Sequence, residues 1–191
     1  MKTYNLIDLL EGAFTLISNS YKKIITTFLD ITSQKTVQKI TISELMQRSN
    51  LKRETFYYYF DSKETLIEET LRFILFTPYL DKLNNNSIAD ANLTLLTTIK
   101  KYPIFFKDLL SPQNEYIFKQ IYCQLSVETL TSFFTKDNGE KISSEFQLAL
   151  KFYAYAVNNI IYEWIQQNFN IENDILVKQL SNIPHTLSTH F

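Results

Sequence analysis

One stretch of the chain, residues 40–63, constrains the fold more than any other. It contains two short segments, 42–48 and 53–59, in which apolar residues recur at the spacing of one helical face. Thr41 stands three residues before a glutamate, which is the spacing of a capping box at a helix start. Asn50 lies between the segments, and asparagine tolerates a left-handed backbone better than any residue except glycine. The stretch therefore predicts a helix-turn-helix.

The second of these helices is expected to present a polar and aromatic face. Phe56 and Phe60 are four residues apart, so they share one side of the helix and should be buried. The other side then carries donors, acceptors and rings that suit DNA base edges and phosphates, namely Lys52, Arg53, Thr55, Tyr58 and Tyr59, with Tyr57 at its border. Arg53, early in the helix, is the candidate for paired hydrogen bonds to a guanine. Lys63 begins the next helix and suits a phosphate.

Charge is unevenly divided along the chain. The formal net charge is -1, but residues 20–65 contain eight basic and five acidic side chains and are therefore net +3. The remainder must be net -4. A basic segment joined to an acidic body is what we expect of a DNA-binding head attached to a domain with another task.

The rest of the chain also has helical spacing. Only two glycines and four prolines interrupt its 191 residues, so we predict an all-α fold. Pro78 is expected to end one helix, and the polar segment 81–87 to form a loop. The predicted helices are 20–33, 42–48, 53–59, 63–77, 88–101, 104–110, 113–135, 143–168 and 172–187.

Several classes of protein are disfavoured by what the sequence lacks. A single cysteine, Cys123, excludes an internal disulfide and a site with several thiolates, and it fits a reducing cytoplasm. No apolar run reaches the roughly 18 residues of a membrane helix. We find no Ser-His-Asp or Cys-His constellation, no P-loop and no glycine-rich dinucleotide turn. We therefore expect a cytoplasmic protein that is not an enzyme, with no cofactor, no metal site and no membrane contact.

The segment from Ser20 to Leu71 resembles the N-terminal domain of the TetR family of transcriptional regulators. The family pattern is matched in order and spacing by Thr41, Leu45, Leu51, Thr55, Phe56, Tyr57, Phe60, Lys63 and Leu66. The resemblance implies that Tyr57 and Lys63 bind phosphates. It implies an operator-facing surface of Ser43, Arg53, Thr55, Tyr58 and Tyr59, and Thr41 and Lys52 complete the predicted DNA-binding set.

The chain departs from the family pattern at four positions. Asn50 replaces the usual glycine and Ser49 the usual alanine, and both are tolerable in a turn. Tyr59 replaces a histidine, which keeps a ring and a polar tip. Lys52 stands where a capping serine or asparagine is common, so the second helix loses a cap worth about 1 kcal/mol.

The remainder of the chain is similar to the C-terminal domain of a Firmicutes-type TetR branch that includes the dihydroxyacetone-kinase regulators. The similarity lies in the order of helices and in the segment 159–165. It implies homodimerisation through the last two long helices, with contacts at Ile160, Ile161, Trp164, Ile165, Ile175, Leu176 and Leu180. We therefore expect two domains: residues 1–66, an N-terminal extension with the helix-turn-helix, and residues 67–191, for effector binding and dimerisation.

Aromatic residues crowd this second domain. They indicate either an apolar ligand pocket or ordinary core packing at helical spacing. The residues expected to line a pocket are Tyr102, Phe105, Phe106, Tyr116, Tyr122, Phe152 and Tyr155.

Together these features predict a DNA-binding transcriptional regulator. The favoured form is a homodimeric repressor that binds a palindromic operator in double-stranded DNA and responds to a small-molecule effector. One alternative is an activator of the same family controlled by a partner protein. Another is a helical protein that binds small molecules and keeps a vestigial DNA-binding head.

Overall fold

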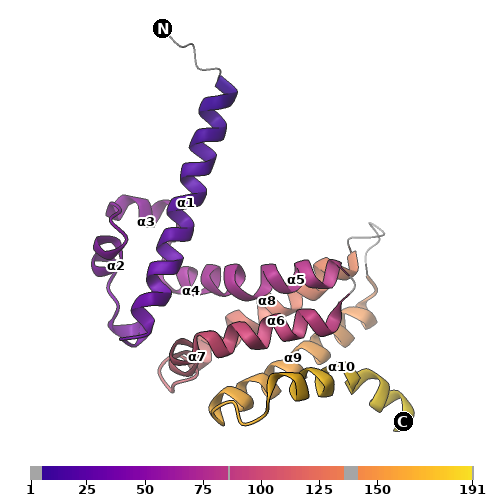
Figure 1. Ribbon diagram of the computed structural model, residues 1–191. Coiled ribbons are helices and arrows are strands. Elements are labelled where there is room, and N and C mark those ends of the chain that lie inside the picture. Colours follow the sequence, from indigo (N-terminus) through magenta and orange to yellow (C-terminus); the bar gives the residue numbers. More distant parts are fainter. Residues whose placement is uncertain (1–5, 86, 136–141, 191) are drawn as a thin grey trace. The chain divides into compact units, whose positions relative to one another are not determined.

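The computed structural model describes residues 6–85, 87–135 and 142–190, and the side chains of these ranges between 19 and 183. Every regular element in the described ranges is a helix, so the all-α prediction is confirmed (Figure 1). The chain forms two compact units, one reaching to Ile67 and the other beginning at Glu68. The roles that we assigned to the two predicted domains stay predictions.

The first unit is built on one long helix, α1 (Leu6–Thr32). The short 3-10 helix η1 (Val37–Lys39) connects it to α2 (Ile42–Arg48), and α3 (Arg53–Tyr59) follows. Helix α1 packs against both α2 and α3, as Figure 1 shows. The core between them consists of side chains with at most 4% of their surface exposed, among them Ile24, Ile25, Phe28, Leu29, Leu45, Met46, Phe56 and Phe60. The predicted bounds of α2 and α3 are confirmed, whereas the helix predicted from residue 20 begins at Leu6.

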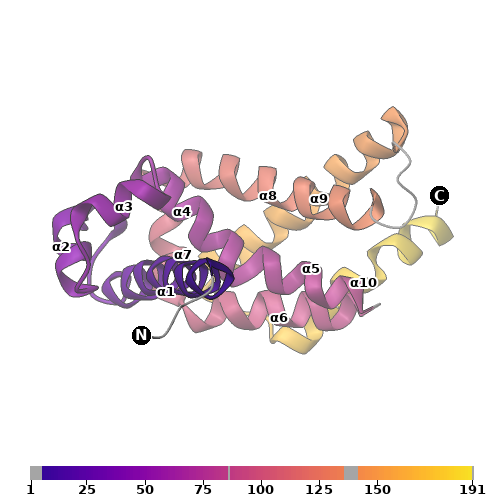
Figure 2. The same cartoon turned by 90° about the horizontal axis from the view of Figure 1, so that it is seen from above.

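Helix α4 (Lys63–Leu71) crosses the boundary between the units and leads into the second one. The short helix η2 (Arg72–Phe76) and helix α5 (Thr77–Asn84) continue it without a break. Helices α6 (Ile88–Lys101), α7 (Pro103–Leu109), α8 (Glu115–Thr135), α9 (Ser144–Gln166) and α10 (Asn173–His190) complete this unit. Helix α6 packs against α5 and α10, while α8 packs against α5 and α9 (Figure 2).

Pro78 does not end its helix, so this prediction was wrong. Immediately before it, η2 is a π-helical segment in which the Thr77 amide donates to the Arg72 carbonyl, five residues back. The wider turn accommodates a ring that would otherwise clash with the preceding turn, and Pro78 then occupies the first turn of α5. Because α5 continues to Asn84, the loop predicted at 81–87 is also shorter than expected.

The predicted helices after α5 are confirmed to within three residues at each end. Over the described residues, none of the helices combines the length and the apolar character needed to cross a membrane.

Candidate nucleic-acid interface and buried cavity

The start of α2 is fixed by a side-chain cap. The Thr41 hydroxyl accepts a hydrogen bond from the Glu44 amide at 3.1 Å, as the capping-box spacing predicts. The Glu44 carboxylate is 2.7 Å from the Lys35 ammonium and 3.1 Å from the Arg48 guanidinium. The hydrogen bond from Lys35 lowers the pKa of Glu44 below its usual 4.5. The contact with Lys35 ties α2 to the segment between α1 and η1, whereas the contact with Arg48 lies within α2.

The turn between α2 and α3 has the geometry predicted for Asn50. This residue has φ 51°, in the left-handed region. Its amide donates to the Gln47 carbonyl at 3.1 Å, and the Leu51 amide donates to the Met46 carbonyl at 3.0 Å. The pair of bonds is a Schellman motif, which satisfies the last carbonyls of α2 and defines the direction in which the chain leaves it. The direction of α3 is therefore set by local hydrogen bonds.

Helix α3 buries one side and exposes the other. Phe56 and Phe60 are 0% and 1% exposed, as predicted, whereas Tyr58 is 68% exposed. Tyr57, predicted at the border, is 47% exposed. Tyr59, predicted to be exposed, is half-buried because its ring packs 5.7 Å from that of Tyr21 on α1. The exposed aromatic surface of α3 therefore consists mainly of Tyr57 and Tyr58.

Arg53 and Lys63 both have partners within the first unit. The Arg53 guanidinium donates to the Tyr57 hydroxyl at 3.2 Å and lies 5.7 Å from the centre of its ring. The Lys63 ammonium donates to the backbone carbonyls of Val37 and Gln38, each at 3.2 Å. Lys63 therefore holds the segment between α1 and α2, a role that the sequence did not indicate.

The first unit brings together all of the predicted DNA-binding residues. Six are exposed: Thr41, Ser43, Lys52, Arg53, Tyr57 and Tyr58. Three are half-buried: Thr55, Tyr59 and Lys63. Lys52 is the N-cap residue of α3 and makes no side-chain cap, because its ammonium can only donate hydrogen bonds. A basic and aromatic surface on the second helix of a helix-turn-helix is the arrangement by which such motifs enter a DNA major groove.

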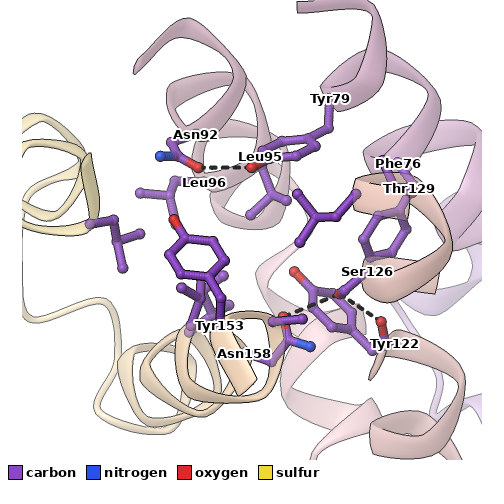
Figure 3. Close-up of a pocket in the computed structure, with 15 residues that line it drawn as sticks. Phe76, Tyr79, Asn92, Leu95, Leu96, Tyr122, Ser126, Thr129, Tyr153 and Asn158 are labelled. Atoms are coloured by element: carbon purple, nitrogen blue, oxygen red, sulfur yellow. Dashed lines mark hydrogen bonds between the residues drawn. The ribbon is translucent and has the colours of Figure 1, made fainter. Parts of the chain in front are cut away.

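A cavity with about 460 Å³ of empty volume, its open mouth included, lies within the second unit (Figure 3). Segment η2 and helices α5, α6, α8, α9 and α10 all contribute to it. Its lining combines apolar and uncharged polar side chains: Phe76, Tyr79, Asn92, Leu95, Leu96, Tyr122, Ser126, Thr129, Leu130, Tyr153, Ala154, Val157, Asn158, Ile161 and Leu180.

Most of the pocket residues predicted from the sequence lie elsewhere. Tyr122 lines the cavity, but Phe105 and Phe106 are buried in the core without reaching it, and Tyr102 is half-buried. Three others are exposed: Tyr116, Phe152 and Tyr155. Helix α9 turns Tyr153, Ala154, Val157, Asn158 and Ile161 toward the cavity, whereas Phe152 and Tyr155 are exposed on another side of the helix. Asn92 also lines the cavity. It is a polar residue on the apolar face of the predicted helix 88–101, and this position could have indicated a pocket from the sequence.

Most of the residues predicted to contact a partner protomer are buried within their own unit. Five of them are buried in their own unit, with at most 2% of their surface exposed: Ile161, Trp164, Ile165, Leu176 and Leu180. A partner chain cannot reach them, because α9 and α10 use these faces to pack within the unit. Ile160 is half-buried and Ile175 is 55% exposed. The exposed large apolar residues of α9 are instead Phe146, Leu148, Phe152 and Tyr155, at 39%, 68%, 72% and 49%.

The two units match two family models. Residues 28–70 match the model of bacterial regulatory proteins of the tetR family, and residues 86–185 match a transcriptional regulator C-terminal region. The second match alone covers more than half of the chain. The chain belongs to the TetR family of transcriptional regulators, and its helix-turn-helix is the DNA-binding part of such a regulator.

The individual proteins that this chain resembles have low sequence identity to it. The biofilm operon icaADBC negative transcriptional regulator IcaR of Staphylococcus aureus strain Newman is 27% identical over 104 residues, which are 54% of this chain and 52% of IcaR. The chain thus spans about half the length of the curated relatives it matches.

Solved structures extend the likeness over most of the chain. The dihydroxyacetone kinase operon activator DhaS has a TM-score of 0.61 at 22% identity, with 90% of this chain and 97% of DhaS covered. A tetR-family transcriptional regulator from Streptomyces coelicolor has a TM-score of 0.54 at 15% identity, with 85% of this chain and 77% of that chain covered. At these identities the likeness shows a shared fold.

Proposed function

We propose that this TetR-family regulator is a ligand-responsive repressor that binds a palindromic operator as a homodimer. The observation that carries the proposal is the exposed face of α3, where Lys52, Arg53, Tyr57 and Tyr58 stand on a helix oriented by the turn at Asn50. A recognition helix must enter the major groove at a defined angle, and a Schellman motif provides that angle without help from DNA.

The exposed residues divide into two roles. Arg53, in the first turn of α3, reads a guanine through two parallel N–H donors, and Tyr58 contacts neighbouring base edges. Lys52 at the start of α3 and the exposed Ser43 on α2 add polar groups to the same DNA-binding unit. Tyr57 and Lys63 bind phosphates, which fix the register of the head on the duplex but carry no sequence information.

Dimerisation follows from the size of the head. One α3 helix contacts too few base pairs to be specific, whereas two of them about 34–36 Å apart read successive major grooves of a palindrome. Members of the family usually act as dimers. The exposed apolar residues Leu148, Phe152 and Tyr155 of α9 form the face that we assign to the partner protomer, since burial on association removes them from water.

The cavity of the second unit is the proposed effector site. An effector releases the operator only if it binds the DNA-free conformation more tightly than the DNA-bound one, and DNA then weakens effector binding by the same factor. IcaR is a negative transcriptional regulator, and this supports the choice of a repressor for this chain.

Fluorescence anisotropy with DNA taken from upstream of the gene tests the proposal. We expect binding to one palindromic segment at least about a thousandfold tighter than to scrambled DNA of the same length. Equal binding to both, or no binding by protein that circular dichroism shows to be folded, would contradict it. Transcription in a reconstituted system that rises when the protein is added would replace the repressor with an activator.

A further inference from the structure

Two buried polar atoms in the cavity have no hydrogen-bond partner among the described residues. They are the hydroxyl oxygen of Tyr122 and the amide nitrogen of Asn92. The two side chains are only 1% and 5% exposed, so almost none of their surface lies on the outside of the protein. A buried donor without a partner costs free energy, and such a group is rare unless something else satisfies it. Both side chains line the cavity, as Figure 3 shows.

Four of the other polar side chains around the cavity, those of Tyr79, Ser126, Thr129 and Asn158, are already paired. Tyr79 donates to the Asn92 carbonyl oxygen at 3.4 Å. The single proton of the Ser126 hydroxyl is shared between the Tyr122 backbone carbonyl at 2.8 Å and the Asn158 Oδ1 at 3.2 Å, and Thr129 donates to the Leu125 carbonyl. These bonds hold the side chains in place and consume their donors. The Tyr122 hydroxyl and the Asn92 amide are therefore the fully buried donors that remain for a ligand, and the half-buried Tyr153 lines the same cavity.

The Tyr122 ring is held firmly. Its centre lies 5.1 Å from that of Phe76, 5.4 Å from that of Phe118 and 5.5 Å from that of Tyr162. Edge-to-face packing of this kind leaves the ring little freedom, so the hydroxyl occupies a defined position before any ligand arrives. Burial raises the pKa of Tyr122, which keeps the hydroxyl protonated and able to donate.

No acidic or basic residue is among the described side chains that line the cavity. A charged ligand would lose its hydration there without gaining a counter-ion, and that loss is large. The lining therefore disfavours both carboxylates and ammonium compounds.

We propose that this cavity binds a neutral, largely apolar molecule bearing an oxygen that accepts hydrogen bonds, such as a ketone, an ester or an amide. Tyr122 and Asn92 donate to that oxygen-bearing group, while Leu95, Leu96 and Val157 surround the apolar part. The assignment rests on the proposed function, in which this cavity holds the effector, and it specifies the chemistry of that effector.

Four compounds of similar size test the assignment by calorimetric titration of the full chain at about pH 7. Acetophenone carries the ketone, ethylbenzene lacks the oxygen, benzoate is an anion and benzylammonium is a cation. We expect acetophenone and ethylbenzene to bind, and both ions to bind at least about a hundredfold more weakly. Benzoate or benzylammonium binding as tightly as acetophenone would overturn the assignment, and so would failure of both neutral compounds to bind.

Variants then identify the donors. Tyr122→Phe and Asn92→Leu should each weaken acetophenone by about five- to tenfold, since each removes one hydrogen bond, and leave ethylbenzene unchanged. Thr70→Val is the matched control, because the Thr70 hydroxyl is also buried without a hydrogen-bond partner among the described residues but is not part of the cavity lining. Acetophenone affinity unchanged in both donor variants would overturn the assignment.

Two further measurements distinguish a failure of the ligand assignment from a loss of folding and from a failure of the proposed function. Without ligand, Tyr122→Phe should melt no lower than the unchanged chain, because its hydroxyl makes no bond to lose; a lower melting temperature would mean that the hydroxyl is already satisfied and would overturn the assignment. Acetophenone is also added to the operator complex. Binding without release of DNA would uphold the chemistry of the cavity and refute its role in regulation.

Discussion

The Arg53 guanidinium donates a hydrogen bond to the Tyr57 hydroxyl at 3.2 Å, one turn further along α3. Both side chains are exposed, so the contact contributes little to stability. Its effect is on orientation: the guanidinium also lies 5.7 Å from the centre of the Tyr57 ring, which limits the directions of its remaining N–H groups. A guanidinium group that is already oriented loses less conformational entropy when it binds a guanine.

Arg53→Ala should therefore reduce specificity. We expect operator affinity to fall by about ten- to a hundredfold, the usual value of one bidentate base contact, and affinity for scrambled DNA to fall much less. Tyr57→Phe, which keeps the ring and removes the acceptor, serves as the comparison and should fall by less than tenfold, about the worth of one hydrogen bond. Anisotropy titrations on both DNAs measure the ratio, and an equal loss on the two for Arg53→Ala would exclude a base contact.

Lys63→Ala should change DNA binding and folding together. Loss of a phosphate contact lowers affinity for every sequence and reduces the slope of log affinity against log salt by about one. Because the ammonium also donates to the Val37 and Gln38 carbonyls, we expect the free energy of unfolding to fall by about 1 kcal/mol. Salt titrations and urea denaturation measure the two effects, and a lower stability with an unchanged salt slope would leave Lys63 a structural role alone.

Asn50 offers a test of the turn. Its φ of 51° is costly for a residue with an ordinary Cβ, so Asn50→Ala should destabilise the chain by about 1 kcal/mol. Asn50→Gly should be neutral or slightly stabilising at this position. Urea denaturation distinguishes the two variants. Equal stability of both would mean that the turn relaxes away from the left-handed conformation.

The helix-turn-helix was predictable because its signals are local. The cap at Thr41, the turn residue Asn50 and the pair Phe56 and Phe60 each act over one or two helical turns. Spacing alone therefore located both helices. It placed Tyr59 on the exposed face and Tyr57 at the border, because the ring that covers Tyr59 belongs to Tyr21, far away in the sequence.

The second unit shows the limit of the same reasoning. The family resemblance implied a dimer through the last two long helices, and helical spacing does not show what an apolar face meets. Trp164 and Ile165 were therefore assigned to a partner although their own chain covers them. Pro78 was read as a helix end because a proline disrupts a regular α-helix. The π-helical turn that accommodates it has no spacing signal of its own.

The stability of the first unit should depend on pH through the Glu44 carboxylate. The Lys35 hydrogen bond lowers its pKa below 4.5, so the carboxylate stabilises the fold above that pH and loses this effect as the pH falls through the lowered value. The melting temperature of the unchanged chain should therefore exceed that of Glu44→Gln at about pH 6, and the difference should shrink toward about pH 3. A difference that is constant over this range would mean that the charge of Glu44 is not what stabilises the unit.

The exposed face of α9 provides the test of dimerisation. Leu148 and Phe152 lie four residues apart, one turn of the same helix, and are 68% and 72% exposed. A charge placed there meets water in the monomer but would be buried in the proposed dimer, where it is costly. Leu148→Arg and Phe152→Glu should each leave the melting temperature of the monomer nearly unchanged and shift the protein from dimer to monomer in sedimentation equilibrium.

Ile104 supplies the matched control. It is also an exposed apolar residue, at 54%, but it belongs to α7 rather than to the face assigned to the partner. Ile104→Arg should leave the oligomeric state unchanged. Monomeric variants should also bind a single half-site about as well as before but lose most of their affinity for the full palindrome, because the second head no longer binds as part of the same molecule. Dimers that persist in both α9 variants would place the interface on another surface.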